Sequence, residues 1–211
     1  MIIPYILAGI IAYLLGSISF SVLISKKMAG FDVREKGSGN AGTTNVLRSV
    51  GKKAAILTLV CDILKVVFAI LIAVILSKIV KNTNASLLVQ IAGVAVIVGH
   101  TFPIFFQFKG GNGIATALGV LLVTNWNIGL VCLIFALILM AVSRMVSLGS
   151  LAAAILFPIL VIVMPSNAYV VEGNYIIYSL IIAILVIFNH RSNVKRLIDG
   201  TENKLDFKKF K

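Results

Sequence analysis

The stretch AAILTLVCDILKVVFAILIAVILS, residues 54–77, decides the fold class. It carries only two charged residues, Asp62 and Lys65, and it exceeds the roughly 20 helical residues that cross the hydrocarbon core of a bilayer. The whole chain of 211 residues is 60% hydrophobic and 12% charged, with a mean hydropathy of +1.08. Water-soluble domains do not reach these values. We therefore predict an all-α integral membrane protein.

Six more apolar segments accompany this one, and together they predict the topology. Residues 113–124 and 128–143 are short for a membrane span, so they form either one long helix or a hairpin broken at 125–127. The basic residues favour the hairpin, because seven spans place sixteen of the nineteen Lys and Arg residues on one side, as the positive-inside rule requires of the cytosolic side. We predict seven transmembrane helices, two of them short, with the N-terminus outside and the C-terminus in the cytosol. The other apolar segments are 2–25, 85–106, 147–165 and 174–189.

Composition and spacing also limit the function classes. The formal charge of +12 lies in short loops beside the spans, without the long cationic face of a nucleic-acid-binding protein. Cys61 and Cys132 fall inside apolar segments, as buried small hydrophobes do, and no residue spacing predicts a metal site. The N-terminal segment lacks a basic leader region, so we expect it to be the first span of a single transmembrane domain covering residues 1–211.

A polar loop between the first two spans has the composition of an anion site. It reads REKGSGNAGTTNVLR over residues 34–48, with Arg34, Lys36 and Arg48 as its basic frame. Small residues let backbone amides surround an anion, and hydroxyl, amide and guanidinium groups can donate to phosphate oxygens. A flexible loop of turn-forming residues is the alternative, although a turn rarely needs so many special residues in succession. The loop predicts a phosphorylated ligand at the membrane surface.

A second glycine-rich segment reads GHTFPIFFQFKGGNGIAT over residues 99–116. A glycine run that opens a helix presents free N–H groups and the positive end of the helix dipole, which together bind anions. The segment is not a nucleotide-binding P-loop, because no Gly-Lys-Ser/Thr follows at the right spacing. The alternative is a tight turn between spans, with His100 as a polar residue satisfied within the protein.

A third polar group follows the last span. His190 and Asn193 are three residues apart, so a continuing helix would place both on one face at the membrane surface. The basic residues at 191, 195 and 196 have an adequate explanation as anchors to lipid headgroups. All three polar groups face the cytosol in the predicted topology.

Asp62 and Lys65 form an i, i+3 pair inside the apolar span at 54–77. Ionisable groups are costly there, so they must pair with each other or face a polar cavity. A structural ion pair and a lysine that faces the site remain two open interpretations.

In this order, the clusters resemble the bacterial membrane family of acyl-phosphate:glycerol-3-phosphate acyltransferases. The matching strings cover nearly the whole chain: GSISF at 16–20, GSGNAGTTNVLR at 37–48, DILK at 62–65, GHTFPIFFQFKGGNGIATALG at 99–119, RMVSL at 144–148 and HRSNVKRLIDGTENK at 190–204. The resemblance implies a seven-span protein of the bacterial plasma membrane with a groove that faces the cytosol. It implies transfer of an acyl chain from acyl phosphate to the 1-hydroxyl of glycerol 3-phosphate, giving lysophosphatidic acid and phosphate.

The resemblance implies no cofactor and no metal. The implied partners are glycerol 3-phosphate, acyl phosphate and membrane lipid, with the enzyme that makes acyl phosphate as a further candidate. Four residues are implied as catalytic polar contacts, Ser38, Arg48, His190 and Asn193, and Glu202 as a structural tie. The residues expected to bind substrate or phosphate are Gly37, Gly39, Asn40, Gly42, Thr43, Asn45, Lys65, His100, Lys109, Gly110, Gly111, Asn112, Gly113, Thr116 and Arg144.

For the mechanism we expect direct attack of the glycerol hydroxyl on the acyl carbonyl, without an acyl-enzyme, because acyl phosphate is already activated. The protein must then position two anions and stabilise the developing oxyanion. Either His190, with its suitable intrinsic pKa, or a substrate phosphate removes the hydroxyl proton; the resemblance implies no conventional protein base and favours the phosphate.

The chain departs from the family pattern at a few positions. Asn112 stands where the family usually has a second lysine, and asparagine can bond a phosphate but supplies no charge. Thr43, Val66 and Asn189 replace a usual alanine, glycine and basic residue. Asn112 motivates a different interpretation, an acyltransferase that uses another donor such as a thioester.

Two further functions compete with acyl transfer, a non-catalytic lipid-binding descendant and a carrier for small phosphorylated solutes. A carrier would need polar residues that thread several spans to the outer face. The outer loop at 166–173 contains no Lys or Arg, and the polar groups gather on one side. The distribution of polar residues therefore disfavours the carrier function.

Overall fold

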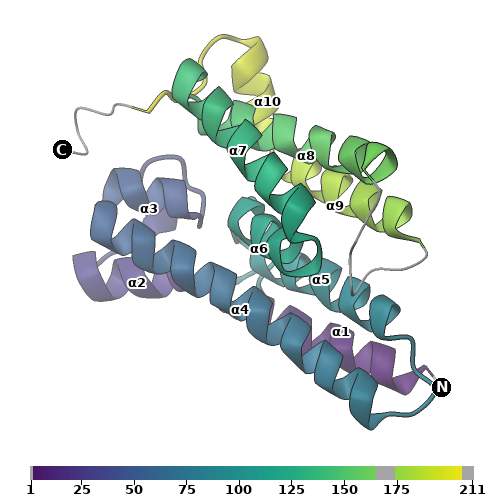
Figure 1. Cartoon of the computed structure of the whole chain (residues 1–211). Coiled ribbons are helices and arrows are strands. Elements are labelled where there is room, and N and C mark those ends of the chain that lie inside the picture. Colours follow the sequence, from purple (N-terminus) through teal and green to yellow (C-terminus); the bar gives the residue numbers. More distant parts are fainter. Residues whose placement is uncertain (1, 165–173, 206–211) are drawn as a thin grey trace.

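The computed structural model describes residues 2–164 and 174–205, and over these residues it is helical without strands (Figure 1). The loop at 166–173, which the sequence analysis places outside, and the end of the basic C-terminal tail lie beyond the described residues. Two 3-10 turns, η1 (Val33–Glu35) and η2 (Ile104–Phe106), interrupt the polar segments. The helices are α1 (Ile3–Gly16), α2 (Phe20–Ala29), α3 (Thr43–Ser49), α4 (Lys52–Ile79), α5 (Ala85–Thr101), α6 (Ile114–Thr124), α7 (Trp126–Ser143), α8 (Val146–Val163), α9 (Tyr175–Asn189) and α10 (Arg191–Ile198).

Each of the seven predicted apolar segments is helical. Within residues 2–164 and 174–205, five helical stretches are long and apolar enough to cross a membrane: α1 together with α2, then α4, α5, α7 and α8. The pair α9 and α10 also qualifies if taken as one span, although it bends by 61°. The helix α6 has only 11 residues and ends at Thr124. The next residue, Asn125, caps α7, because its Oδ1 accepts from the Ile128 N–H at 3.3 Å. The all-α membrane fold and the hairpin are thus confirmed, although the break is Asn125 alone and only α6 is short. The number of seven spans and their orientation stay predictions.

The two faces of α4 differ in the way expected of a helix in a lipid bilayer. Large apolar side chains such as Ile56, Leu57 and Phe68 are about half exposed, where a water-soluble helix would place polar groups. The opposite, buried face carries small and polar residues, which let neighbouring helices approach closely and bond to one another. That buried face includes Ala54, Thr58, Asp62, Lys65, Ala69 and Ala73.

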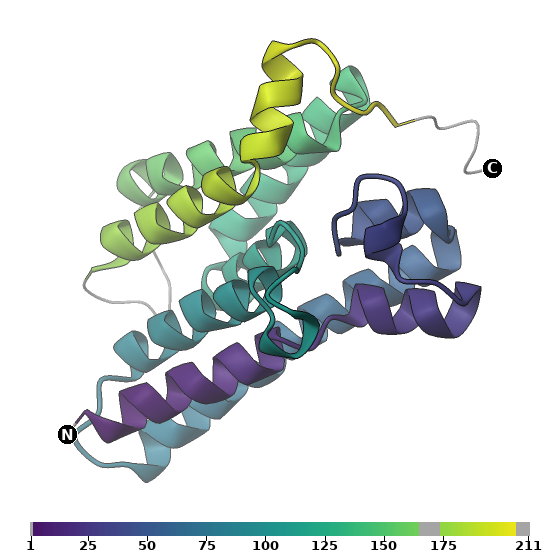
Figure 2. The ribbon, with the colours of Figure 1, turned by 180° about the vertical axis from the view of Figure 1, so that it is seen from behind.

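The helices form two groups with α6 between them. In Figures 1 and 2, α1, α4 and α5 run together, while α7, α8 and α9 form the second group. Close contact between α1 and α5 depends on glycine, because a Cβ atom at Gly16 would collide with the backbone of Val96 and one at Gly99 with the backbone of Tyr13. The helices α2, α3 and α10 lie at the end of the molecule away from the N-terminus.

Lys65 joins α4 to a break in the first apolar segment. The helix α1 ends at Gly16 and α2 begins at Phe20, so carbonyl groups in the break have no helical partner. The Lys65 Nζ donates to the carbonyls of Gly16 at 3.1 Å and Ile18 at 3.0 Å, and it lies 2.9 Å from Asp62 Oδ1. The structure thus shows the ion pair with Asp62, while a role of Lys65 in the site stays a prediction.

Candidate functional site

The three polar groups of the sequence meet around one cavity of about 290 Å³. It lies where the loop before α3, the start of α6, the start of α8 and the residues of α10 with its tail approach one another (Figures 1 and 2). Twelve of the predicted site residues line it: Ser38, Asn40, Gly42, Thr43, Asn45, Arg48, His100, Asn112, Gly113, His190, Asn193 and Glu202.

Asn45 shapes the first polar loop from within. Its Nδ2 donates to the carbonyls of Val33 at 2.8 Å, Lys36 at 3.0 Å and Asn40 at 3.0 Å, and its Oδ1 accepts from the Ser38 N–H at 3.0 Å. The loop therefore wraps around one buried amide. The positive-φ residues Gly37 and Gly39 belong to this turn and do not line the cavity.

Of the three basic residues that frame this loop, Arg48 alone lines the cavity. Its guanidinium is half-buried, and one nitrogen donates to the Asn203 carbonyl at 3.3 Å. Burial lowers the pKa of Arg48 from its ordinary value, yet a guanidinium stays charged at neutral pH. Arg34 instead pairs with Asp32 at 2.7 Å and donates to the Phe106 carbonyl at 2.8 Å, which ties the two glycine-rich loops together.

The second glycine loop is built differently from what the sequence predicted. The N–H groups of Gly110 and Gly111, expected to bind an anion, donate to the carbonyls of Thr101 and His100, both at 3.1 Å. Neither glycine lines the cavity, and a Cβ atom at Gly110 would collide with the His100 carbonyl. Glycine is needed here for close packing of the loop on the end of α5. The following residues, Asn112 and Gly113, do line the cavity.

Four other predicted binding residues lie outside the cavity lining. Lys109 and Arg144 are exposed, and Lys65 serves the buried ion pair. Thr116 is buried in the first turn of α6, where its Oγ1 donates to the Gly113 carbonyl at 2.9 Å. The backbone of Arg144 has a structural contact, since its carbonyl accepts from the Leu205 N–H at 2.7 Å and holds the tail beside α8.

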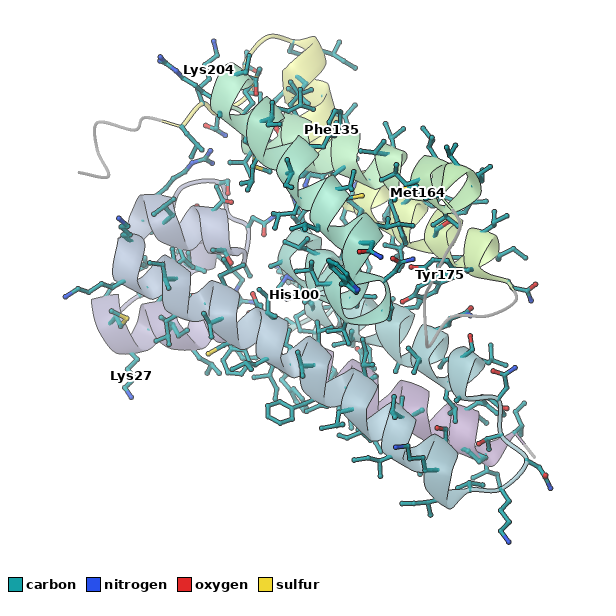
Figure 3. All side chains as sticks on the ribbon, in the orientation of Figure 1. Lys27, His100, Phe135, Met164, Tyr175 and Lys204 are labelled. Atoms are coloured by element: carbon teal, nitrogen blue, oxygen red, sulfur yellow. The ribbon has the colours of Figure 1, made fainter. Side chains whose placement is uncertain are left out.

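The two histidines carry the ring hydrogen on different nitrogen atoms. The Nδ1 of His100 lies 2.9 Å from Lys65 Nζ; because an ammonium only donates, this nitrogen accepts and Nε2 carries the hydrogen, next to Gly111. Figure 3 shows His100 in the interior, between the two helix groups. The Nδ1 of His190 lies 2.8 Å from the Val186 carbonyl, so there Nδ1 carries the hydrogen and Nε2 keeps its lone pair.

His190 corrects one sequence expectation. The helix does not continue through it: α9 ends at Asn189, α10 begins at Arg191, and the two bend by 61°. The bend places the buried His190 in the cavity lining together with Asn193. His190 lies just beyond the apolar helix, and burial lowers its pKa, which favours the neutral ring.

Sequence reasoning missed several cavity residues. The sequence pattern explains Arg196 as a lipid anchor, but its Nε donates to Glu202 Oε2 at 2.9 Å, and both residues line the cavity. Arg196 follows Asn193 by three residues, a spacing that places both on one face of a helix and could have marked Arg196 as a site residue. Thr44, Ser147, Ser192 and Asn203 lie inside the family strings but were not singled out as site residues, and Asp62 was considered only with Lys65. Ser150 lies outside every string, and no local pattern marks it.

A second, apolar cavity of about 110 Å³ adjoins the polar one. The two share Ile114, Leu118 and Ser150 in their lining. The apolar cavity lies among α6, α7, α8 and α9, and its other lining residues include Leu121, Cys132, Ala136, Met140, Ala153 and Phe157. The site thus combines a polar chamber that carries Arg48 and Arg196 with an apolar chamber that shares part of its wall.

Comparison with known proteins identifies the family. Residues 6–200 match the family described as glycerol-3-phosphate acyltransferase. The chain belongs to this family. A glycerol-3-phosphate acyltransferase of Clostridioides difficile is 41% identical over 99% of this chain and 98% of its own length. Another, from Shouchella clausii, is 43% identical over 97% of this chain and 98% of its own.

Solved structures agree with the sequence comparison. The glycerol 3-phosphate form of PlsY, an integral membrane glycerol 3-phosphate acyltransferase, matches with a TM-score of 0.84 and 36% identity over 97% of both chains. Its lysophosphatidic acid form matches with a TM-score of 0.81 over 96% of this chain and 95% of that one. These likenesses confirm the predicted family and the integral membrane fold of this glycerol-3-phosphate acyltransferase family member.

Proposed function

We propose that this protein transfers an acyl chain from acyl phosphate to the 1-hydroxyl of glycerol 3-phosphate, giving lysophosphatidic acid and inorganic phosphate. The observation that carries the proposal is the pairing of the two cavities. A polar chamber with two guanidinium groups suits phosphate, and an apolar chamber that shares part of its wall suits the start of an acyl chain. The reacting carbonyl then sits where the two meet, near Ser150.

The polar chamber supplies several donors for substrate phosphates. Arg48 and Arg196 line it, together with the hydroxyl and backbone groups of the loop from Ser38 to Thr44. A buried, positioned donor stabilises developing negative charge more strongly than water does, and such contacts are the largest catalytic contributions in acyl transfer. We assign Ser38 and Arg48 as direct contacts to substrate oxygens and Asn193 as a substrate contact on the opposite wall.

The reaction needs no acyl-enzyme. The hydroxyl oxygen of glycerol 3-phosphate attacks the acyl carbon, the bond from that carbon to the phosphate oxygen breaks, and the departing phosphate takes the hydroxyl proton. The protein contributes position and charge, which convert a bimolecular encounter into a reaction within one complex. His190, neutral and with a free Nε2, accepts a hydrogen bond in the chamber without having to be the final proton acceptor.

The proposed acyl donor, acyl phosphate, has one alternative, a thioester such as acyl-CoA. Asn112 removes a positive charge where the family usually carries lysine, and a thioester carbonyl brings less negative charge to the reacting centre than an acyl phosphate does. A member with this asparagine could therefore use acyl-CoA. The cellular setting that we propose is the bacterial plasma membrane with the cavity open to the cytosol, where the enzyme that makes acyl phosphate would be a neighbour.

One assay decides among these outcomes. Purified protein in lipid vesicles receives labelled glycerol 3-phosphate with palmitoyl phosphate, or with palmitoyl-CoA in a parallel reaction, beside an Arg48→Ala variant. Lysophosphatidic acid from palmitoyl phosphate alone, lost in the variant, supports the proposal. Product from the thioester alone moves the function to the rival donor, and no product from either in folded protein contradicts acyl transfer.

A further inference from the structure

The helix α10 has two faces of different character. Asn193 and Arg196 are three residues apart, so they share one face, and both line the polar cavity. Arg191, Lys195 and Ile198 follow the i, i+4, i+7 spacing of the opposite face, and all three are exposed. The sequence pattern explains the three cations alike as lipid anchors, whereas the structure separates Arg196 from the other two.

The outward face of α10, made of Arg191, Lys195 and Ile198, continues an exposed apolar side of α9. Phe188 in the last turn of α9 is 55% exposed, and Ile184 one turn earlier is 65% exposed. The Cζ of Arg191 lies 4.8 Å from the centroid of the Phe188 ring, and its Nη1 donates to the Phe188 carbonyl at 3.2 Å. The outward face therefore begins at an aromatic ring on the apolar surface of a membrane helix.

The bend between α9 and α10 suits a helix that lies along a membrane surface. The 15-residue α9 is apolar, and α10 leaves its direction by 61° (Figures 1 and 2). If α9 runs along the membrane normal, α10 lies closer to the membrane plane than to the normal. Exposed cations beside an exposed apolar side chain at the end of a span are typical of segments in the headgroup region.

Within the part of the chain that the structure describes, α10 is held mainly by polar bonds on its cavity face. None of its eight residues is buried. Asn193 donates to Glu202 Oε1 at 3.0 Å and accepts from Asn112 Nδ2 at 3.2 Å. Arg196 donates to Glu202 Oε2 at 2.9 Å. Because segments with few buried apolar contacts open easily, a contact on the outward face would stabilise α10 and the placement of its two cavity residues.

We propose that the outward face of α10 binds the phosphate groups of anionic phospholipids and that this contact holds Asn193 and Arg196 in place in the polar cavity. Arg191 and Lys195 supply the charge, and Ile198 enters the apolar margin of the headgroup region. The occupant is a lipid and not an acidic protein, because the face joins exposed apolar side chains of a membrane helix. The kinetic consequence rests on the proposed function, since it assigns regulation to the same site.

A fluorescence experiment tests the lipid contact without any acyl transfer. The parent protein carries Trp126→Phe, which removes the one native tryptophan, and Ile198→Trp, which introduces the probe on the outward face. It is placed in vesicles of phosphatidylcholine and phosphatidylglycerol, one of which is brominated. We expect brominated phosphatidylglycerol to quench the probe more strongly than an equal amount of brominated phosphatidylcholine.

Charge variants of this parent identify the groups that hold the lipid. Arg191→Gln with Lys195→Gln should remove the preference for phosphatidylglycerol. The matched control, Lys52→Gln with Lys53→Gln, removes two exposed cations at the start of α4 and should retain the preference. Equal quenching by both lipids in the parent would overturn the proposal, as would a preference that survives the loss of both α10 cations. No quenching by either lipid would place the face in water, open to an acidic protein, and would overturn it too.

Kinetics with the native tryptophan and isoleucine in place test the link to the polar cavity. Adding phosphatidylglycerol to phosphatidylcholine vesicles should raise the kcat/KM of wild type about fivefold or more, since each basic residue near an anionic surface adds about that factor in affinity. Arg191→Gln with Lys195→Gln should respond less than about twofold, and the α4 control should respond as wild type does. Repulsion of the anionic substrates by the vesicle acts on all three proteins, so the difference between them reports on α10.

The lipid contact and the proposed function can fail separately. Equal kinetic responses in wild type and in the α10 variant would overturn the link between the lipid and the cavity. If no protein forms product, the proposed function fails, while the quenching still decides whether α10 binds anionic lipid.

Discussion

The polar and apolar cavities share part of one wall and are held in shape by different forces. The polar cavity is enclosed mainly by loops and helix ends from distant parts of the chain, which directional hydrogen bonds hold together. The apolar cavity is enclosed by the sides of α6, α7, α8 and α9, whose shape follows from side-chain volume. The loss of one polar side chain should therefore remove a defined contact in the polar cavity. A change of one side chain in the apolar cavity should instead alter the volume of that cavity gradually.

The largest effect should come from the ion pair beneath the polar cavity. Lys65→Met leaves Asp62 as a buried charge without its partner, and such losses cost about 3–5 kcal/mol. The break after α1 also loses its two lysine contacts. We expect a clear drop in the free energy of unfolding, measured by denaturant titration in detergent.

The matched control restores charge balance. Asp62→Asn combined with Lys65→Met removes both charges and should destabilise the protein less than Lys65→Met alone, because no buried charge is left unpaired. A single variant as stable as wild type would show that the pair carries little of the structure around the polar cavity.

Next in size is the loss of the cavity guanidinium. Arg48→Ala should lower kcat/KM about 10²- to 10³-fold, the usual cost of removing one positioned donor to transition-state charge. Lys36→Ala is the control, because Lys36 is a basic residue of the same loop that is exposed and does not line the cavity. Steady-state kinetics should place the control within about twofold of wild type. Equal losses in both variants would mean that general positive charge matters and the cavity contact does not.

The apolar cavity should respond in a graded way. Ala136→Leu on α7 adds volume to its wall and should lower kcat/KM for stearoyl phosphate relative to myristoyl phosphate about fivefold, since each buried methylene is worth about 0.8 kcal/mol. Ala141→Leu, on the exposed side of the same helix, should leave the ratio unchanged. If Ala136→Leu leaves this ratio unchanged, the acyl chain does not bind in the apolar cavity.

The smallest effect should be the pH dependence of the polar cavity near neutrality. Burial lowers the pKa of His190 below the ordinary value of 6.5, so the folded protein favours the neutral ring. The contribution of neutral His190 is complete above that ordinary value and is lost as pH falls through the lower folded value. The ratio of wild-type to His190→Gln activity should change less than twofold between about pH 7 and 8 and decline only at acidic pH. A ratio that instead rises as the pH falls would show that the protonated ring is the working form.

Many site residues were predictable because local motifs mark them. Ser38, Arg48, His190 and Asn193 all line the cavity, as the spacing and the family strings indicated. Gly110 and Gly111 were expected to bind an anion, but their N–H groups are bonded inside the protein. A glycine run looks the same in sequence whether its amides face a ligand or a neighbouring carbonyl, and only the distant partner decides.

The sequence by itself determined the all-α membrane class and the positions of the apolar helices. The length of an apolar segment and the distribution of basic residues are local properties, and they act directly on how a segment inserts in the bilayer. Tertiary structure alone decided which polar groups work together. Arg34 pairs with Asp32 while Arg48 lines the cavity, and Asn112 bonds residues 72 and 81 positions away in the chain. These assignments depend on directional contacts between segments brought together by folding, which local composition cannot encode.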